Sequence, residues 1–185
     1  MEHQKETSKV KIMKAFYELL ETKDFDRITV LEIVQKAKVG RSTFYDHFEA
    51  KELLLKKVCS EIFEHVFSKE LTAENSHDFS ETKPNLKQSL IHLLYHLKEQ
   101  KDQINLLFRG NGKDLFIRYF NAYEAILFQK YISFENIQLP KDLVLYFLIS
   151  GFSSMVIWWF EKDCQLNPVQ VIQYYERMLP ESILC

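Results

Sequence analysis

Apolar residues recur at helical spacing along most of the chain. Ile12, Ala15, Phe16, Leu19 and Leu20 follow the i, i+3, i+4, i+7, i+8 pattern of one buried helix face. Similar stripes predict helices over about 8–22, 30–37, 41–47, 50–71, 85–99, 101–109, 113–132, 141–163 and 168–179. No stretch indicates a strand of useful length. The pattern therefore predicts an all-α protein of about nine helices.

Glycine and proline are rare in the chain. The 185 residues contain 4 Gly and 4 Pro, about a third of the number that average usage would supply. Barrels, sandwiches and Gly-rich nucleotide-binding folds need many more such residues for their turns. Pro140 and Pro168 stand where the last two helices begin, a position that proline tolerates, and the polar residues 72–84 predict a loop.

The first three predicted helices form a compact arrangement. Thr29 and Glu32 have the spacing of a capping box, in which each side chain bonds to the other's backbone at a helix start. Residues 38–40 then end this helix, and a second short helix over 41–47 turns Phe44 and Phe48 inward. Two short helices joined by a tight turn on a first helix predict a helix-turn-helix unit.

The second short helix has the chemistry that the DNA major groove requires. Arg41, Ser42 and Thr43 at its start can hydrogen-bond to base edges. Donors for backbone phosphates flank it, namely Thr29, Tyr45, His47 and Lys51. Partial core packing is the alternative role for Tyr45 and His47, and a solvated helix start is the alternative for Lys51.

Net charge alone does not identify a partner. The whole chain carries −2, whereas residues 36–57 hold six basic and three acidic side chains. These are Lys36, Lys38, Arg41, Lys51, Lys56 and Lys57 against Asp46, Glu49 and Glu52. Such an excess suits an anionic partner, and a helical surface of mixed charge has the same composition.

Residues 29–54 resemble the DNA-binding domain of TetR/AcrR-type transcriptional regulators. The resemblance rests on the run Thr29-Val30-x-x-Ile33-x-x-x-Ala37-x-Val39-x-Arg41-Ser42-Thr43-Phe44-Tyr45-x-His47-Phe48-x-x-Lys51-Glu52-x-Leu54. It implies that Thr29, Tyr45, His47 and Lys51 position phosphates, and that Arg41, Ser42 and Thr43 meet base edges, with Arg41 suited to guanine. It also implies a helix-turn-helix domain over 1–49 and a helical effector-binding and dimerisation domain over 50–185.

Two positions depart from the family's usual pattern. Lys38 stands where glycine is usual in the turn, and Gly40 stands where serine usually caps the recognition helix. Lys38 must therefore adopt the left-handed conformation at some cost, or the turn has another shape. Gly40 caps less well than serine.

The C-terminal part is rich in aromatic residues, most of which must form a core. The resemblance implies an effector pocket among the middle helices, which aromatic side chains would fit to an apolar or flat ligand. Periodicity does not separate pocket from core. The ligand-binding candidates are Phe63, Phe108, Tyr119 and Tyr123.

Residues 143–160 carry no charge and are too apolar for a helix with one solvated face. This favours burial in the core or against a second copy of the chain over a membrane span, for which 18 residues is the lower length limit. The resemblance also implies a dimer built from the last two helices. The interface candidates are Phe152, Trp159, Ile172 and Tyr175.

Other chemistries have weak support. His92 and His96, with Glu99 one turn on, have a spacing that can hold a transition metal, but no further ligand is evident. Cys59, Cys164 and Cys185 form no C-x-x-C pair, which argues against a disulfide framework. We find no catalytic or cofactor motif. The first eight residues lack an apolar signal segment, so we expect a soluble cytoplasmic protein.

Together these features predict a DNA-binding regulator that is not an enzyme. We expect a homodimeric repressor that a small-molecule effector releases from a palindromic double-stranded DNA operator, without a metal, a cofactor or a membrane. Two alternatives stay open. One is a regulator that needs a partner protein or corepressor to bind DNA, and the other is a helical interaction protein without operator binding.

Overall fold

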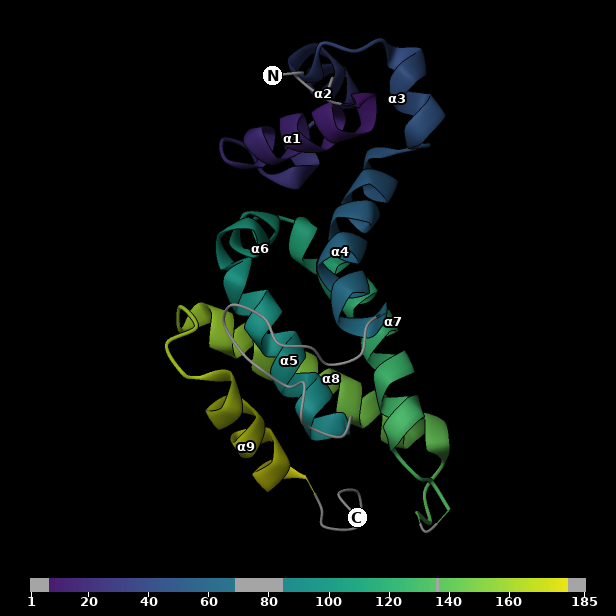
Figure 1. The fold of residues 1–185 in the computed structure, drawn as a ribbon, viewed down its shortest axis with the longest axis vertical. Helices are drawn as coiled ribbons and strands as arrows, with labels where there is room; N and C mark the ends of the chain where they lie inside the picture. Colours follow the sequence, from purple (N-terminus) through teal and green to yellow (C-terminus); the bar gives the residue numbers. More distant parts are fainter. Residues whose placement is uncertain (1–6, 69–84, 136, 180–185) are drawn as a thin grey trace, which may run out of the picture. The chain divides into compact units, whose positions relative to one another are not determined.

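The computed structural model describes residues 7–68, 85–135 and 137–179, and over these residues it contains helices and no strand (Figure 1). The predicted all-α fold class is confirmed. A short 3-10 helix, Phe25–Arg27, joins the first two α-helices. The α-helices are α1 Ser8–Leu20, α2 Val30–Ala37, α3 Arg41–His47, α4 Lys51–Ser68, α5 Leu86–Glu99, α6 Lys101–Leu107, α7 Gly112–Tyr131, α8 Lys141–Glu161 and α9 Pro168–Met178.

Helix boundaries follow local capping chemistry. The Thr7 side chain accepts a hydrogen bond from the Val10 amide at the start of α1, and Asn167 closes a capping box with Gln170 at the start of α9. Helix α3 has the predicted bounds, and the other described helix ends lie within about two residues of prediction. The predicted end of the long helix near residue 71 and the predicted loop 72–84 lie outside the described residues.

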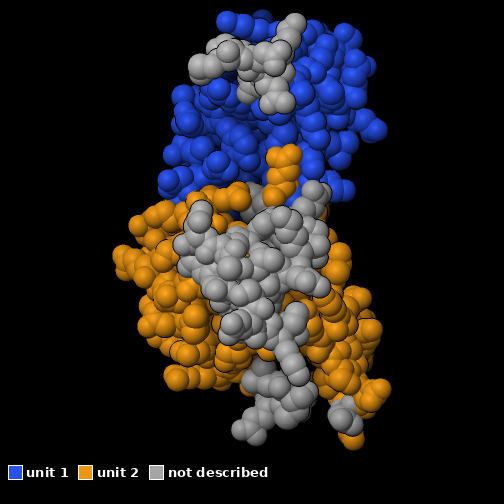
Figure 2. Space-filling model, viewed as in Figure 1, with its two compact units in different colours: residues 1–60, 102–116 blue, residues 61–101, 117–185 orange. Residues whose placement is uncertain are grey.

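The chain folds into two compact units, which Figure 2 colours separately. Unit 1 holds residues 1–60 and 102–116, and unit 2 holds 61–101 and 117–185. Segment 102–116 joins unit 1 through two hydrogen bonds. Arg109 Nη1 donates to Glu21 O at 3.1 Å, and Asn111 N donates to Asp26 Oδ2 at 3.1 Å. The expected division into a DNA-binding domain over 1–49 and an effector-binding domain over 50–185 stays a prediction.

Unit 1 has its core between α1, α2 and α3. Ile12, Phe16, Ile33 and Phe44 are fully buried there. The ring of Phe25, from the connection between α1 and α2, meets the Phe16 ring edge-on with centroids 6.1 Å apart, a preferred aromatic geometry. This core fixes the orientation of α3.

Unit 2 has an aromatic core contributed by α7, α8 and α9. The rings of Phe128, Phe152 and Tyr175 form a mutual cluster, with the Phe152 centroid 6.2 Å from Phe128 and 5.2 Å from Tyr175. Helix α9 packs against both α5 and α8. Helix α8 packs into this core with one side, and apolar residues on its other side are exposed.

The exposed side of α8 is itself strongly apolar. Leu143, Tyr146, Phe147 and Trp158 are exposed there, Tyr146 at 73%. Among the described helices, α8 alone has the length and composition that could cross a membrane, and 44% of its most apolar stretch is buried inside the protein. A core helix of a soluble protein has the same properties, so length and composition do not decide between the two.

Candidate nucleic-acid interface

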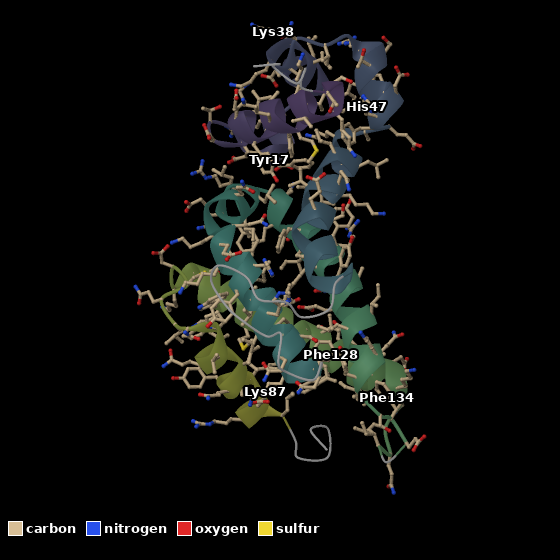
Figure 3. All side chains as sticks on the ribbon, viewed as in Figure 1. Tyr17, Lys38, His47, Lys87, Phe128 and Phe134 are labelled. Atoms are coloured by element: carbon tan, nitrogen blue, oxygen red, sulfur yellow. The ribbon has the colours of Figure 1, made fainter. Side chains whose placement is uncertain are left out.

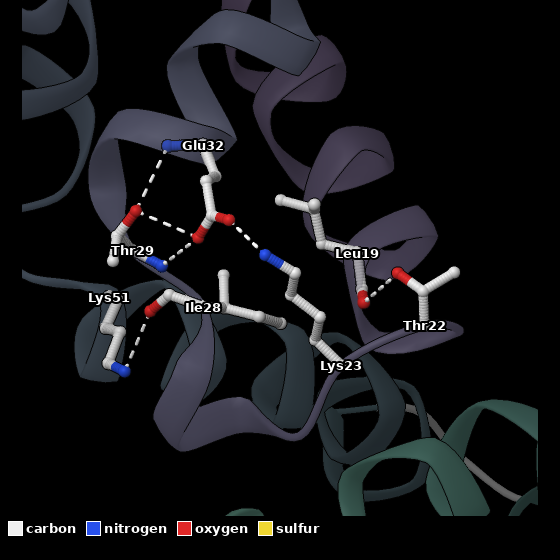
Figure 4. Close-up of polar contacts among 7 residues, drawn as sticks. All are labelled: Leu19, Thr22, Lys23, Ile28, Thr29, Glu32 and Lys51. Carbon is white, nitrogen blue, oxygen red and sulfur yellow. Dashed lines mark hydrogen bonds and ion pairs between the residues drawn. The ribbon is translucent and has the colours of Figure 1, made fainter.

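The start of α2 is held by the predicted capping box. Thr29 Oγ1 accepts a hydrogen bond from the Glu32 amide at 3.3 Å, and the Thr29 amide donates to Glu32 Oε2 at 2.9 Å (Figure 4). Lys23 forms an ion pair with the same carboxylate. The hydrogen bonds from Lys23 and Thr29 lower the pKa of Glu32 to about 2. Thr29 is exposed beside this fixed helix end.

The turn between α2 and α3 has the left-handed geometry that the sequence raised as a possibility. Lys38 has φ 54° and ψ 45°, a region that favours glycine because a Cβ crowds the following carbonyl there. Gly40 precedes α3 in an extended conformation and makes no side-chain cap. The turn thus keeps its shape with a strained lysine in place of glycine.

Helix α3 separates an apolar face from a polar one. Phe44 and Phe48 are buried, with ring centroids 5.8 Å apart. Arg41 and Ser42, in the first turn of the helix, are exposed and Thr43 is half-buried. The buried aromatic pair fixes the rotation of the helix, so that its first residues face solvent.

Tyr45 and His47 occupy the later part of α3. Tyr45 is 54% exposed and packs its ring edge against Phe44, with centroids 5.4 Å apart. His47 is exposed, and its Nε2 lies 2.8 Å from Ser8 Oγ at the start of α1; Figure 3 labels this residue at the α3 end of unit 1. Tyr45 therefore has a solvent-facing hydroxyl, whereas His47 is already linked to α1.

Lys51 has a different environment from the one expected. Its Nζ donates to three backbone carbonyl oxygens, those of Phe25 at 2.9 Å, Asp26 at 3.1 Å and Ile28 at 2.9 Å. An ammonium has three N–H donors, and all three are used. The side chain is therefore engaged inside unit 1, which does not fit the expected contact with a DNA phosphate.

These features define a helix-turn-helix unit. A helix held by a capping box, a tight turn and a second helix with a polar outer face lie on a common core. A second helix of this size fits the major groove, which is about 12 Å wide, and its flanking polar groups can meet phosphates. The class of protein is a DNA-binding regulator.

Sequence comparison identifies the family. Residues 12–58 match "Bacterial regulatory proteins, tetR family" and residues 84–181, more than half of the chain, match "Transcriptional regulator C-terminal region". The chain belongs to the TetR family of DNA-binding transcriptional regulators, as its residues 29–54 suggested.

Individual relatives match shorter stretches. The dhaKLM operon transcriptional activator DhaS of Lactococcus lactis is 43% identical over 65 residues, which are 35% of this chain and 32% of DhaS. The uncharacterized regulator YxbF of Bacillus subtilis is 40% identical over 60 residues, 30% of this chain and 16% of YxbF. The matched stretch thus spans a third or less of each relative's length.

Solved structures match over nearly the whole chain. A TetR transcriptional regulator from Streptococcus agalactiae 2603V has a TM-score of 0.67 and 28% identity, covering 92% of both chains. A TetR-family regulator from Shewanella sp. PV-4 has a TM-score of 0.57 at 14% identity, covering 94% of this chain and 96% of its own. The second similarity concerns the fold alone.

Two of the four ligand-binding candidates are in direct ring contact. In unit 2 the Phe63 ring lies 5.0 Å from that of Tyr123 and 5.3 Å from that of Phe120. Phe108 belongs to unit 1, where its ring meets Phe116 at 5.2 Å. Tyr119 is half-buried in unit 2. Phe63 on α4 and Tyr123 on α7 are thus in ring contact.

The dimer candidates lie inside a single copy. Phe152, Trp159, Ile172 and Tyr175 have exposures between 0 and 3%. Trp159 Nε1 donates to Leu166 O at 3.1 Å and the Tyr175 hydroxyl to Leu148 O at 2.7 Å. These residues cannot face a partner without unfolding the core. The other side of α8 was missed, because a helix that is apolar all round does not indicate which face is internal.

The remaining candidates for sensing chemistry are buried. His92 and His96 are 1% and 5% exposed, with Nε2 atoms 3.0 Å apart, and His96 Nδ1 lies 3.3 Å from Glu99. Within the described ranges no three or more His, Cys, Asp or Glu side chains are arranged so that they could hold a metal ion. Burial raises the pKa of Cys59 to about 12 and that of Cys164 to about 11, which keeps both thiols protonated and weakly nucleophilic at neutral pH.

Sequence reasoning also missed a polar group inside unit 2. Glu124 on α7 is fully buried, with Oε2 3.0 Å from Ser153 Oγ on α8. Burial raises the pKa of its carboxyl well above 4.5, although the hydrogen bond to Ser153 acts in the opposite direction. The sequence signal for this buried group was a glutamate at a position on the apolar face of a predicted helix.

Proposed function

We propose that this regulator binds a palindromic operator as a homodimer and acts as a repressor that a small-molecule effector releases. The observation that carries the proposal is the polar start of α3. Arg41 and Ser42 are exposed there, on a helix whose rotation is fixed by the buried Phe44. We assign base-edge contacts to Arg41, Ser42 and Thr43, because their side chains can donate and accept in the major groove.

The assigned phosphate contacts are Thr29, Tyr45 and His47. Thr29 stands at the N-terminus of α2, where the helix dipole favours an anion. Its hydroxyl donates to Glu32 Oε2 at 2.9 Å, so a phosphate contact would take the place of that hydrogen bond. The exposed Tyr45 hydroxyl can donate to a phosphate oxygen. His47 would contact a phosphate either while keeping its hydrogen bond to Ser8 or in exchange for it. For Lys51 we propose a structural role, since its three donors are already used.

The homodimer is supported by the exposed apolar faces of α8 and α9. Leu143, Tyr146, Phe147 and Trp158 on α8 are exposed, as are Tyr174 and Met178 on α9. Several large apolar side chains exposed on neighbouring helices are typical of a protein–protein interface. A second copy of the chain is the occupant that gives a palindromic operator two recognition helices. The expected location is the cytoplasm, because the DNA is there.

Effector binding would act through the helices shared by both units. The boundary between the units falls inside α4 and inside α7. An effector held near the aromatic pair Phe63 and Tyr123 could therefore tilt α4 and change the separation of the recognition helices. Effector and operator must then weaken each other's binding reciprocally.

The test is binding to the gene's own upstream DNA. We expect wild-type protein to bind that duplex more tightly than an unrelated duplex, with affinity falling as salt rises. Arg41→Ala should abolish the preference and Tyr45→Ala should weaken binding to both duplexes. Lys130→Ala in unit 2 is the control. A folded dimer with no preference for its upstream DNA would contradict the proposal.

The relative DhaS supports a second candidate function. Its name describes a transcriptional activator, and an activator or a regulator that needs a partner or corepressor uses the same helix-turn-helix unit. Transcription from the bound promoter separates the two functions. A repressor lowers transcript yield in the absence of effector, whereas an activator raises it.

A further inference from the structure

Unit 1 carries a lysine-lined hollow on the side formed by α1 and the end of α2. Its volume is about 250 Å³ and its walls include Lys11, Lys14, Lys36 and Lys38. Ala15 and Ala37 lie between them, and such small side chains leave room above the backbone. Glu18 is the one acidic residue of the lining. The hollow thus holds four ammonium groups and one carboxylate.

The charge of this hollow is only partly balanced. Lys36 Nζ lies 3.2 Å from Glu18 Oε2, so one lysine has a local counterion. Lys11 and Lys14 are three residues apart on α1, a spacing that places them on one helix face. Lys38 is exposed at the periphery of unit 1 (Figure 3). Lys11, Lys14 and Lys38 therefore line a concave surface that favours an anion.

The backbone of Lys38 gives an independent indication. Its φ of 54° is a conformation in which glycine carries no strain and lysine does. Residues held in such sparsely populated backbone conformations cluster at active sites, ligand-binding sites and switch regions. The strain thus coincides with one of the lysines that line the hollow.

The position of the hollow along the chain suggests the anion. Lys38 lies three residues before Arg41, at the end of α3 that is proposed to enter the major groove. DNA carries one negative charge per about 1.7 Å of helix axis, so phosphates flank every groove-bound residue.

We propose that Lys11, Lys14 and Lys38 form a second phosphate-binding surface that holds the operator backbone beside the groove occupied by α3. This inference rests on the proposed DNA binding and adds contacts outside the helix-turn-helix residues already assigned. Contacts with phosphates carry no sequence information. The surface should therefore increase affinity for all duplexes equally, and it should contribute to the salt dependence of binding.

The experiment compares two triple variants of the full chain. Lys11→Gln/Lys14→Gln/Lys38→Gln removes the proposed phosphate ligands, and Lys130→Gln/Lys141→Gln/Lys162→Gln makes the same change in net charge in unit 2. Binding of the upstream duplex and of an unrelated duplex is measured by fluorescence anisotropy between about 50 and 200 mM salt. The first variant should bind both duplexes more weakly by the same factor. Its plot of log K against log salt should become shallower by about 0.9 for each phosphate that the variant no longer neutralises.

Lys38→Gly separates charge from folding. It relieves the left-handed strain, so the variant should be at least as stable as wild type and still bind DNA more weakly with a shallower salt slope. Equal slopes for wild type and both triple variants would overturn the inference while leaving specific DNA binding intact. Wild type that binds neither duplex would overturn the proposed function as well.

A small phosphate compound is the other ligand that the lysine-lined hollow could bind. If inorganic phosphate at constant ionic strength stabilised wild type but not the lysine triple variant, and the DNA salt slope were unchanged, the hollow would bind a small phosphate. That outcome would overturn the assignment to the DNA backbone.

Discussion

The Lys51 ammonium lies 4.6 Å from the centre of the Phe25 ring and donates a hydrogen bond to the Phe25 carbonyl oxygen at 2.9 Å. The same group donates to Asp26 O and Ile28 O. One side chain at the start of α4 thus fixes the whole connection between α1 and α2, which also precedes Thr29.

Replacing Lys51 by Met should destabilise unit 1 without a specific effect on salt dependence. The change leaves three carbonyl oxygens without their charged donor, and hydrogen bonds to charged groups are worth about 2 kcal/mol. We expect the free energy of unfolding to fall by about 2–3 kcal/mol in urea titrations. Lys56→Met, at an exposed position of the same helix, should change it little. Unchanged stability with a shallower DNA salt slope would instead assign Lys51 to a phosphate.

Replacing Lys38 by Gly should stabilise the protein. The left-handed conformation costs a non-glycine residue roughly 1–2 kcal/mol, and the added freedom of the unfolded chain offsets about half of the gain. A net increase of about 0.5–1 kcal/mol in the free energy of unfolding is expected. Lys36→Gly, inside α2, should have the opposite sign, because glycine weakens a helix interior. A decrease in stability in Lys38→Gly would show that the turn depends on the lysine side chain.

Gly112 is required by a close backbone approach at the start of α7. A Cβ there would lie closer than 3.0 Å to the Leu107 carbonyl oxygen and 3.3 Å from the Phe25 Cβ. Because Leu107 O is a backbone atom and cannot yield as the end of a flexible side chain would, Gly112→Ala should lower the free energy of unfolding by about 2 kcal/mol. The control is Gly151→Ala, whose Cβ would meet Tyr175 at an ordinary 3.8 Å. Equal melting temperatures for the two variants would refute this account.

The helix-turn-helix unit could be predicted because its determinants are local. A capping box, two aromatic residues four apart and a Gly40 N-cap are sufficient for α2 and α3, and the structure has each of them. Strain at Lys38 followed from the same local comparison. Hydrophobic periodicity does not indicate which backbone carbonyl a polar side chain will bind. The acceptors of Lys51 lie 23–26 residues away, so its role appears only in three dimensions.

For the C-terminal helices, the sequence did not predict which helix faces are buried. Helix α8 is apolar on all sides, so its sequence does not distinguish the residues that pack inside one copy from those on the surface. Phe152 and Trp159 were expected at the interface and lie in the core, whereas Tyr146 and Phe147 are exposed. Contacts with α9, which depend on the fold, decide between the two faces.

Charge on the exposed face of α8 should dissociate the proposed dimer without unfolding the chain. Phe147 is 55% exposed, so Phe147→Asp removes no core packing, but it would bury an unpaired charge at an interface. Sedimentation equilibrium should show a dissociation constant raised by at least tenfold, and operator binding should weaken with it. Gln165→Asp, exposed beyond the end of α8, is the control. A variant that is dimeric at the wild-type concentration would place the interface elsewhere.

The hydrogen bonds around the buried carboxyl of Glu124 require one more proton than an ionised carboxylate leaves available. Ser153 Oγ lies 2.5 Å from Asn121 Oδ1 and 3.0 Å from Glu124 Oε2, yet one hydroxyl has a single proton to donate. If Glu124 is protonated, its O–H donates to Ser153 and Ser153 donates to Asn121, so every short contact has a proton. Glu124 Oε1 has no hydrogen-bond partner among the described residues, which further disfavours a charge on this carboxyl.

Glu124→Gln should therefore remove a pH dependence of stability. The pKa of Glu124 is raised in the folded state, so this group's stabilising contribution is complete below about pH 4.3, its unfolded pKa. It is lost as pH rises toward the folded pKa, by at most about 1.4 kcal/mol per pH unit. Glutamine cannot ionise, and its amide can donate to Ser153. Urea unfolding should show wild type and variant close together at low pH, with the variant increasingly more stable toward pH 8. Exposed Glu135→Gln should give no such divergence, and parallel pH profiles for Glu124→Gln and wild type would mean that the folded protein holds Glu124 ionised.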